Sequence, residues 1–270
     1  MAGQQLDLFA ADPIGIEQGS RGAQPPLRAA ELTDASLIAA LSDAGLATAP
    51  SLAVEAGRRR LVGAIPALDR LCRRLVGFGR DRVVPEQASA LEALTAIGGA
   101  DARRVVARLV ADRIVQGPTL AAALSAAAAL GAPLPPFRLA ELLRDADPSV
   151  RAGACRCVRS AAPQLEPLIE LLDDLNPDVA TAAAIALGRI GRAEARPRLI
   201  GLLRTQPAAE VIEALTPIAD EEVIVAFGWT ARSMPDLMPP VLEALEQLDD
   251  PRAAVVASTL RGGASRIDPL

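Results

Sequence analysis

Few side chains in this sequence are suited to catalysis. The 270 residues include no histidine and no tyrosine, and every one of the 28 basic residues is arginine. The chain therefore lacks the commonest general base and metal ligand, the lysines of Schiff-base chemistry and the lysine of phosphate-binding loops. We predict that the protein is not an enzyme and uses no cofactor. The arginine-only, alanine-rich usage indicates a GC-rich bacterial genome.

Cysteine and aspartate supply the remaining candidates for redox or metal chemistry. The three cysteines form no disulfide framework, and Cys-x-Cys is neither the Cys-x-x-Cys redox spacing nor half of a zinc site. We interpret them as buried small apolar residues: Cys72, Cys155 and Cys157. Three aspartates surround one turn: Asp173, Asp174 and Asp178. Their position favours capping of helix ends, and we expect no metal there.

The N-terminal peptide QLDLF places two large apolar side chains, Leu8 and Phe9, next to each other. Glycine, proline and polar residues dominate positions 10–26, so we expect a flexible tail over residues 1–30. An extended peptide of this type binds by inserting large apolar side chains into a groove of its partner. Leu8 and Phe9 would fill a deep pocket, Leu6 a shallower contact, and the Gln5 amide would form a hydrogen bond.

The same pentapeptide, Gln5-Leu6-Asp7-Leu8-Phe9, resembles the clamp-binding motif of bacterial DNA polymerases, repair proteins and clamp regulators. The preferred form of that motif is Gln-Leu-Ser-or-Asp-Leu-Phe, and every position matches. The resemblance implies docking on the bacterial DNA polymerase sliding clamp, the beta subunit, during replication or repair. The alternative is structural, with Leu6, Leu8 and Phe9 folded back to cap the first pair of helices.

Charge is distributed unevenly along the chain, whose net charge is −5. Residues 51–113 carry 12 arginines and 7 acidic residues, whereas residues 164–270 carry 9 arginines and 17 acidic residues. Eight arginines are candidates for a basic stripe that contacts a nucleic acid or an acidic partner: Arg58, Arg59, Arg60, Arg70, Arg73, Arg74, Arg80 and Arg82. The alternative is a solvated surface with local pairs such as Asp69 with Arg73. Few aromatic residues are present for base stacking, so any DNA contact would be weak.

Helical periodicity dominates the chain, and no alternating apolar pattern predicts a strand. The helices that we expect in the first half are Ala35–Ala44, Leu52–Leu61, Pro66–Val76, Pro85–Ile97, Arg103–Val115 and Leu120–Leu130. No apolar run reaches the roughly 18 residues of a membrane helix, and the N-terminus lacks the pattern of a secretory signal. We predict an all-α cytoplasmic protein with no membrane association.

The second half contains a repeat of about 30 residues. Copies occupy 139–162, 168–191 and 199–219, with a partial copy from Val241, and Pro148, Pro177 and Pro207 fall 29 and 30 residues apart. Each copy reads as an amphipathic helix, a turn, and a second, alanine-rich helix. Asp147 and Asn176 precede the prolines and are placed to cap the second helix, whose first residue is proline.

The stretch LLDDLNPDVATAAAIALGRIGRAEARPRLIGLL, residues 171–203, resembles HEAT repeats of the short bacterial type first associated with phycobilisome lyases. The resemblance implies a HEAT-like α-solenoid of stacked antiparallel helix pairs. We expect this solenoid over residues 31–270, with degenerate repeats at 31–135 and clearer repeats at 136–260. Trp229 lies with Phe227, Met234 and Met238 where the repeat pattern is interrupted. A ligand-binding insertion is one interpretation, and we favour the other, a core plug between imperfect repeats.

Three classes of function are compatible with these features. We favour an adaptor that docks on the sliding clamp through its N-terminal peptide and presents the solenoid to a second protein or to DNA. The second class is a general protein-protein scaffold with a structural N-terminus. The third is an enzyme, either a bilin lyase or a HEAT-like DNA glycosylase. A glycosylase needs an aromatic-rich cleft with a placed carboxylate, such as Asp236 beside Trp229 in one concave basic groove.

Overall fold

Helices form most of the chain that the structure, a computed structural model, describes: residues 28–159 and 165–264. No strand occurs in these ranges. The α-helices are α1 (Asp34–Asp43), α2 (Ala49–Arg58), α3 (Ile65–Arg74), α4 (Pro85–Ile97), α5 (Gly99–Ala111), α6 (Pro118–Leu130), α7 (Pro136–Leu142), α8 (Pro148–Cys157), α9 (Leu165–Glu170), α10 (Pro177–Arg189), α11 (Arg196–Thr205), α12 (Ala209–Leu215), α13 (Glu221–Ser233), α14 (Met238–Gln247) and α15 (Pro251–Ala264).

Short 3-10 helices lead into or extend several of these elements. They are η1 (Ala29–Glu31), η2 (Val62–Ala64), η3 (Leu171–Asp173), η4 (Ala193–Ala195), η5 (Thr216–Ile218) and η6 (Pro235–Leu237). All six helices expected in the first half are present, and α4 has the expected ends. The all-α prediction is therefore confirmed for the described residues. None of the described helices combines the length and the apolar content needed to span a bilayer.

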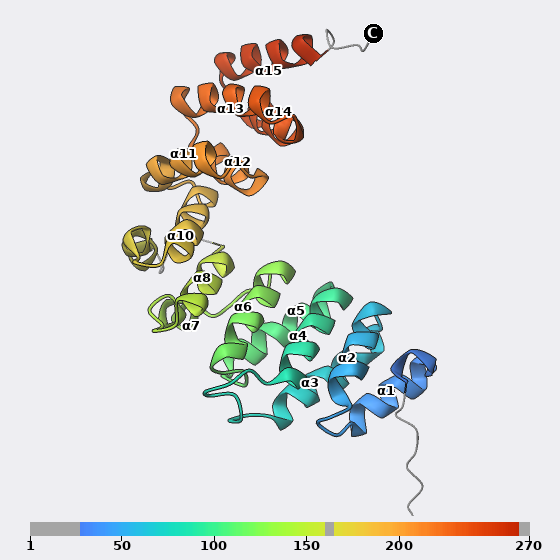
Figure 1. The fold of residues 1–270 in the computed structure, drawn as a ribbon. Helices are drawn as coiled ribbons and strands as arrows, with labels where there is room; N and C mark the ends of the chain where they lie inside the picture. Colours follow the sequence, from blue (N-terminus) through green and yellow to red (C-terminus); the bar gives the residue numbers. More distant parts are fainter. Residues whose placement is uncertain (1–27, 160–164, 265–270) are drawn as a thin grey trace, which may run out of the picture.

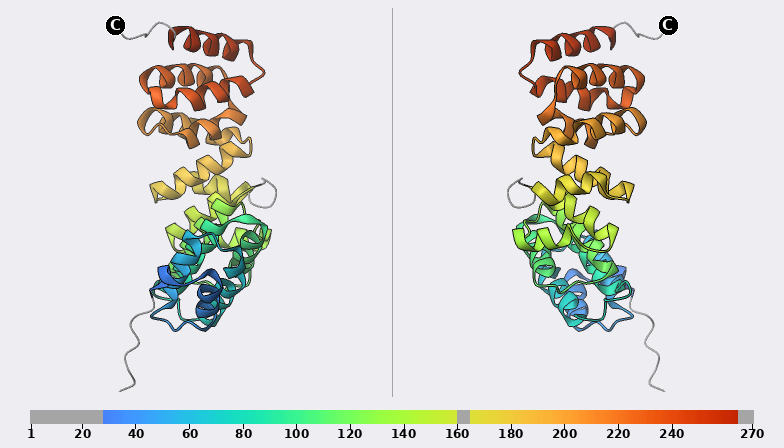
Figure 2. Two further views of the ribbon diagram at one scale, coloured as in Figure 1. Left: turned by 90° about the vertical axis from the view of Figure 1, so that its right-hand side faces the viewer. Right: turned by 90° about the vertical axis from the view of Figure 1, so that its left-hand side faces the viewer.

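The helices stack in two layers. Even-numbered helices contact one another in sequence from α2 to α14, while α1, α3 and α5, and later α11, α13 and α15, form the second layer. Figure 1 shows that the stack curves, with α12 and α14 towards the inside of the curve and α11 and α13 towards the outside. The side views of Figure 2 show the same stack as one elongated body. This is the arrangement of an α-solenoid.

Capped turns begin the second helix of the clearest repeats. The Asn176 side-chain oxygen accepts hydrogen bonds from the backbone N–H groups of Asp178 and Val179, at 2.9 and 3.3 Å. The Asp147 carboxylate accepts one from the Ser149 N–H at 2.8 Å. The prolines that follow are the first residues of α8 and α10, where the missing N–H has no cost. The predicted capping of both turns is confirmed.

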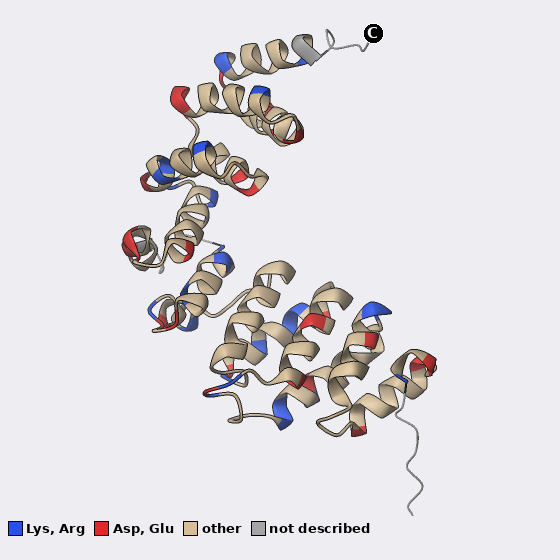
Figure 3. Cartoon of the chain, viewed as in Figure 1, with Lys and Arg blue, Asp and Glu red and all other residues tan. Residues whose placement is uncertain are grey.

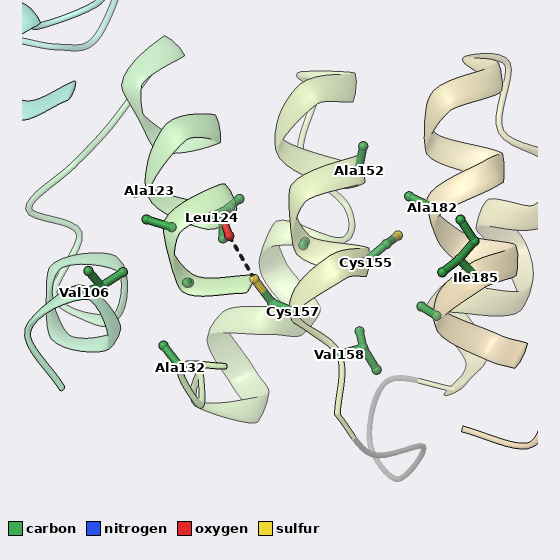
Figure 4. Close-up of a cluster of buried hydrophobic side chains, with 14 of the residues drawn as sticks. Val106, Ala123, Leu124, Ala132, Ala152, Cys155, Cys157, Val158, Ala182 and Ile185 are labelled. Carbon is green, nitrogen blue, oxygen red and sulfur yellow. Dashed lines mark hydrogen bonds between the residues drawn. The ribbon is translucent and has the colours of Figure 1, made fainter. Parts of the chain in front are cut away.

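Small side chains fill the space between neighbouring helices of the even-numbered layer. Alanine predominates on the buried face of α10, and Gly188 lies so close to α12 that an added Cβ would be 2.4 Å from the carbonyl oxygen of Ala214. Figure 4 shows the equivalent junction around α8, where alanine, cysteine and leucine side chains meet. This close approach sets the spacing between repeats, and therefore the positions of the exposed residues that each repeat carries.

Candidate protein-binding site

The peptide Gln5-Leu6-Asp7-Leu8-Phe9 lies outside the described residues. Its proposed role in binding, and the alternative role as a cap on the first helices, both stay predictions. The first described residue is Arg28, directly before η1.

One member of the predicted arginine stripe holds the N-terminal helices together. The Arg59 guanidinium donates from Nε to the Glu55 carboxylate, from Nη1 to Asp34 and the Leu32 carbonyl, and from Nη2 to the carbonyls of Ala29 and Ala30. These contacts use all five N–H groups of the side chain. Arg59 therefore links α2 to η1 and to the start of α1 by hydrogen bonds, and no N–H group is left to bind a phosphate.

The other seven arginines divide into paired and unpaired side chains. Arg58 forms an ion pair with Glu55 at 2.7 Å, and Arg73 pairs with Asp69 at 2.9 Å, which confirms the expected i, i+4 pair. Arg70 and Arg74 donate to Ser42 and to the Ala44 carbonyl. The exposed side chains with no partner in the described part of the chain are Arg60, Arg80 and Arg82. Binding of a nucleic acid or an acidic partner by the stripe stays a prediction.

The Glu55 carboxylate binds both Arg58 and Arg59. Its side chain accepts hydrogen bonds from Arg58 and from Arg59, at distances of 2.6 to 2.8 Å. The hydrogen bonds from these two arginines lower the pKa of the Glu55 carboxyl from its ordinary 4.5 to about 2, against the opposing effect of burial. The Glu55 carboxyl is therefore ionised at neutral pH and remains so below its ordinary pKa.

Trp229 does not plug the core, so that interpretation is wrong. The residues around it form a regular helix, α13, on which Phe227 is fully buried and Trp229 is 65% exposed. Residues two positions apart lie on different faces of a helix, so Phe227 and Trp229 cannot both face the core. Phe227 is the large buried side chain, and Trp229 is displayed on the surface.

A groove of about 780 Å³ runs between α11 and α13, with Trp229 among its lining residues. Five of the ten other lining side chains are apolar: Leu203, Pro207, Val225, Ala226 and Met234. Val225 and Met234 are 51% and 41% exposed, so the apolar surface faces solvent rather than the core. The hydroxyl of Thr230 at the same groove donates to the Ala226 carbonyl at 2.9 Å. A surface of this kind is suited to an apolar side chain of a protein partner.

Three charged residues that line this groove, Arg204, Glu221 and Glu222, form ion pairs. Arg204 pairs with Glu222 at 3.2 Å, and Arg252 of α15 pairs with Glu221 at 2.6 Å. All four side chains are more than half exposed, so the pairs contribute little to stability. Asp236, the carboxylate that a glycosylase would need beside Trp229, is not among the residues that line the groove.

A second, more polar groove of about 720 Å³ lies along α10, α12 and α14. Arg189 pairs there with Glu210 and Glu213, at 3.3 and 3.1 Å. Figure 3 shows that residues of both charges are distributed along the stack, and Glu210, Glu213 and Glu243 line this groove, so it is not a continuous basic path. The sequence pattern pointed to Trp229 as one possible ligand-binding residue but defined neither groove, because each groove combines residues from different helices.

All three cysteines are buried and free, as predicted. Burial raises the pKa of each thiol to about 12, so the reactive thiolate is scarce at neutral pH. The Cys157 thiol donates to the Leu124 carbonyl at 3.3 Å, as Figure 4 shows. Cys155 and Cys157 are therefore part of the packing between α6, α8 and α10, and Cys72 is buried on α3.

The aspartate cluster is built into the turn before α10. Asp174 accepts two hydrogen bonds from the Arg151 guanidinium, at 2.9 and 3.0 Å, and one from the Asn176 backbone N–H at 2.8 Å. The hydrogen bonds from Arg151 lower the pKa of the Asp174 carboxyl, and the hydrogen bond from the Asn176 N–H lowers it further by a smaller amount. Within the described ranges, no three His, Cys, Asp or Glu side chains are grouped so as to hold a metal ion.

Comparison with known proteins agrees with this architecture. Residues 135–219 match the family model described as HEAT repeats. This range contains the three repeats that the sequence pattern predicted. No curated protein matches the chain. The match and the two-layered stack define the described body as a HEAT-like α-solenoid, a class of repeat protein whose extended surfaces serve as scaffolds for protein interactions.

Proposed function

We propose that this protein is a non-enzymatic adaptor whose solenoid binds a protein partner in the groove between α11 and α13. The observation that carries the proposal is the single tryptophan of the chain, exposed in an apolar groove of a HEAT-like scaffold. Tryptophan is the residue type most enriched among energetically dominant interface positions. The fitting occupant is a peptide segment with a large apolar anchor. The absence of histidine and lysine from the sequence and the raised thiol pKa values support a non-catalytic role.

A pair of exposed valines allows a matched test of the groove. Val225 lies inside it, while Val255 on α15 is 64% exposed and is not among its lining residues. Peptides selected on the intact protein from a random display library should carry large apolar residues and change Trp229 fluorescence. Val225→Asp should weaken their binding about tenfold or more, as expected for loss of a well-packed apolar contact. An equal effect of Val255→Asp, or selected peptides that leave the fluorescence unchanged, would refute the groove as the binding site.

We further propose that the adaptor docks on the bacterial DNA sliding clamp through Gln5-Leu6-Asp7-Leu8-Phe9. The support is the match of all five positions to the clamp-binding motif. Burial of Leu8 and Phe9 would supply about 3 to 6 kcal/mol of transfer free energy. The cost of ordering the peptide reduces this, so we expect a dissociation constant of roughly micromolar size. This role would place the solenoid and its bound partner at sites of replication or repair.

Calorimetry of the intact protein with a purified bacterial sliding clamp tests this docking. We expect micromolar binding that the double substitution Leu8→Ala with Phe9→Ala abolishes. The control is Trp229→Ala, which removes the groove anchor and should leave clamp binding unchanged. Absence of binding at tens of micromolar would leave the protein as a HEAT-like scaffold without a clamp connection.

A further inference from the structure

The loop of residues 75–84, which joins α3 to α4, exposes an unusual set of side chains. Val76, Phe78 and Val83 are 45%, 60% and 53% exposed. Arg80 and Arg82 lie between these apolar residues and have no partner among the described residues. We call this surface the Phe78 loop. It combines apolar contact area with two unpaired positive charges and one exposed carboxylate, Asp81, so its net charge is positive.

The base of the Phe78 loop is fixed to the body of the protein. The Val84 N–H donates to the Thr119 hydroxyl at 2.9 Å, in a buried hydrogen bond. Gly79 is buried against the turn before α6, where Gly117 has a φ of +55° and an added Cβ would lie 2.1 Å from the Gly79 carbonyl oxygen. The loop is therefore anchored by backbone packing, and its exposed side chains are presented on a defined support.

The sequence of the same chain contains a segment of complementary chemistry. Before Arg21, the N-terminal residues carry three acidic side chains and no basic one: Asp7, Asp12 and Glu17. The same stretch contains the apolar residues Leu6, Leu8 and Phe9. Acidic side chains suit the unpaired arginines, and the leucines and phenylalanine suit Val76, Phe78 and Val83. Two aliphatic side chains in the loop favour a peptide over a nucleic acid, whose bases stack on aromatic rings.

The fold brings the start of the described chain near the loop. Arg59 fixes η1 to α2, and Arg74, one residue before the loop, donates to the Ala44 carbonyl just after α1 at 3.1 Å. Helix α1 spans only about 15 Å. The chain from Phe9 to Arg28 reaches about 65 Å when fully extended. The N-terminal peptide therefore has ample length to reach Phe78 in the same molecule.

We propose that the Phe78 loop is the docking surface for the N-terminal peptide of its own chain. The tether gives the peptide an effective concentration of roughly millimolar order, so even a weak contact is occupied much of the time. The docked peptide conceals Leu8 and Phe9 until a stronger binder displaces the loop. Only this regulatory consequence rests on the proposed clamp docking, while the contact itself does not depend on it.

Photo-crosslinking in the full-length chain tests the contact directly. Phe9 is replaced by the photoreactive analogue p-benzoylphenylalanine, and mass spectrometry maps the products formed in the monomer after irradiation. We expect crosslinks to residues 75–84. The double substitution Arg80→Glu with Arg82→Glu should reduce them about tenfold, since two favourable ion pairs become repulsive. The matched control is Arg60→Glu with Arg232→Glu, which changes the net charge equally at two exposed positions outside the loop and should leave the crosslinks intact.

Two results would overturn the proposal. One is crosslinking to residues outside 75–84, and the other is crosslinking between two chains in place of the intramolecular product. Circular dichroism of each variant establishes that it is folded. In calorimetry with the clamp, the Arg80→Glu, Arg82→Glu variant should bind more tightly than the parent, because the competing contact is lost. A chain that fails to bind the clamp still yields the crosslink, so the two proposals fail independently.

Discussion

A single arginine determines how the N-terminal end of the solenoid is closed. Arg59 satisfies three backbone carbonyls and two carboxylates, although its sequence context, Arg58-Arg59-Arg60, resembles a solvated basic cluster. The three neighbours differ because Arg59 turns towards η1, whereas Arg60 is exposed and has a φ of +52°. Composition alone could not separate them, since the separation depends on contacts about 30 residues apart in the chain.

The lowered pKa of Glu55 predicts a specific dependence of stability on pH. A carboxyl whose pKa falls from 4.5 to about 2 on folding stabilises the fold above pH 4.5, and this contribution disappears as the pH falls towards 2. Glu55→Gln should therefore lower the Tm by several degrees at pH 6 and by progressively less below pH 4.5. Thermal melts across this range measure the difference. The control is Glu92→Gln on α4, an exposed carboxyl outside any ion pair of the described chain, and a pH-independent deficit for Glu55→Gln would contradict the assignment.

The two aromatic residues of α13 mark the limit of residue-level prediction. Their types and their position beside an irregular repeat indicated large side chains in the core, and this holds for Phe227 alone. The helical period separates the faces of Phe227 and Trp229, but the choice of which face is buried depends on α15 and α11, which pack on either side. Pairing α13 with those neighbours requires the tertiary structure.

Helix boundaries followed closely from local chemistry at the scale of single elements. Proline at the first helical position and an Asn or Asp side chain before it placed the starts of α8 and α10 correctly. The weaker copy departs from this pattern, because Pro207 lacks such a capping residue and α12 begins at Ala209 with no side-chain cap. Local capping signals were therefore predictive wherever they were complete.

Glycine at helix crossings gives a prediction for the element scale. Gly188→Ala places a Cβ 2.4 Å from the Ala214 carbonyl oxygen, a backbone atom that cannot rotate away, so α10 and α12 must separate. We expect a loss of about 1 to 3 kcal/mol in the free energy of unfolding, measured by urea titration. Gly201→Ala on α11 is the matched control, because nothing lies within 4 Å of its added Cβ, and it should be neutral or stabilising. Equal losses for both variants would show that helix separation is not the cause.

At the scale of the whole molecule, each helix pair packs on the next pair along the stack, and the described part of the chain has no single central core. The junction of α8 with α10 carries the Arg151–Asp174 pair, in which the Asp174 side chain is 8% exposed and the Arg151 side chain 18% exposed. Arg151 also donates to the carbonyls of Asp145 and Ala146, so it ties its own turn to the next repeat. In the following repeat Ala180 occupies the position of Arg151, so the corresponding ion pair cannot form there.

Weakening that junction should separate the unfolding of the two halves. Asp174→Asn removes the charge that binds Arg151, and we expect a loss of about 2 kcal/mol at this junction. Trp229 fluorescence reports only the C-terminal half, whereas far-UV circular dichroism reports every helix. The two urea transitions should coincide in the parent chain and separate in Asp174→Asn. A variant whose two probes still unfold together would show that the junction does not limit cooperativity.

Each helix pair of the solenoid contacts mainly the neighbouring pairs, so the length of the stack depends on the number of pairs. The Phe78 loop and the groove between α11 and α13 belong to opposite halves of the stack and share no helix. Insertion or deletion of one helix pair between them would change their separation by the spacing of packed helices, about 10 Å, and leave the local surroundings of each intact. In such a molecule the distance between two surface sites is set by the number of repeats, independently of the residues that form each site.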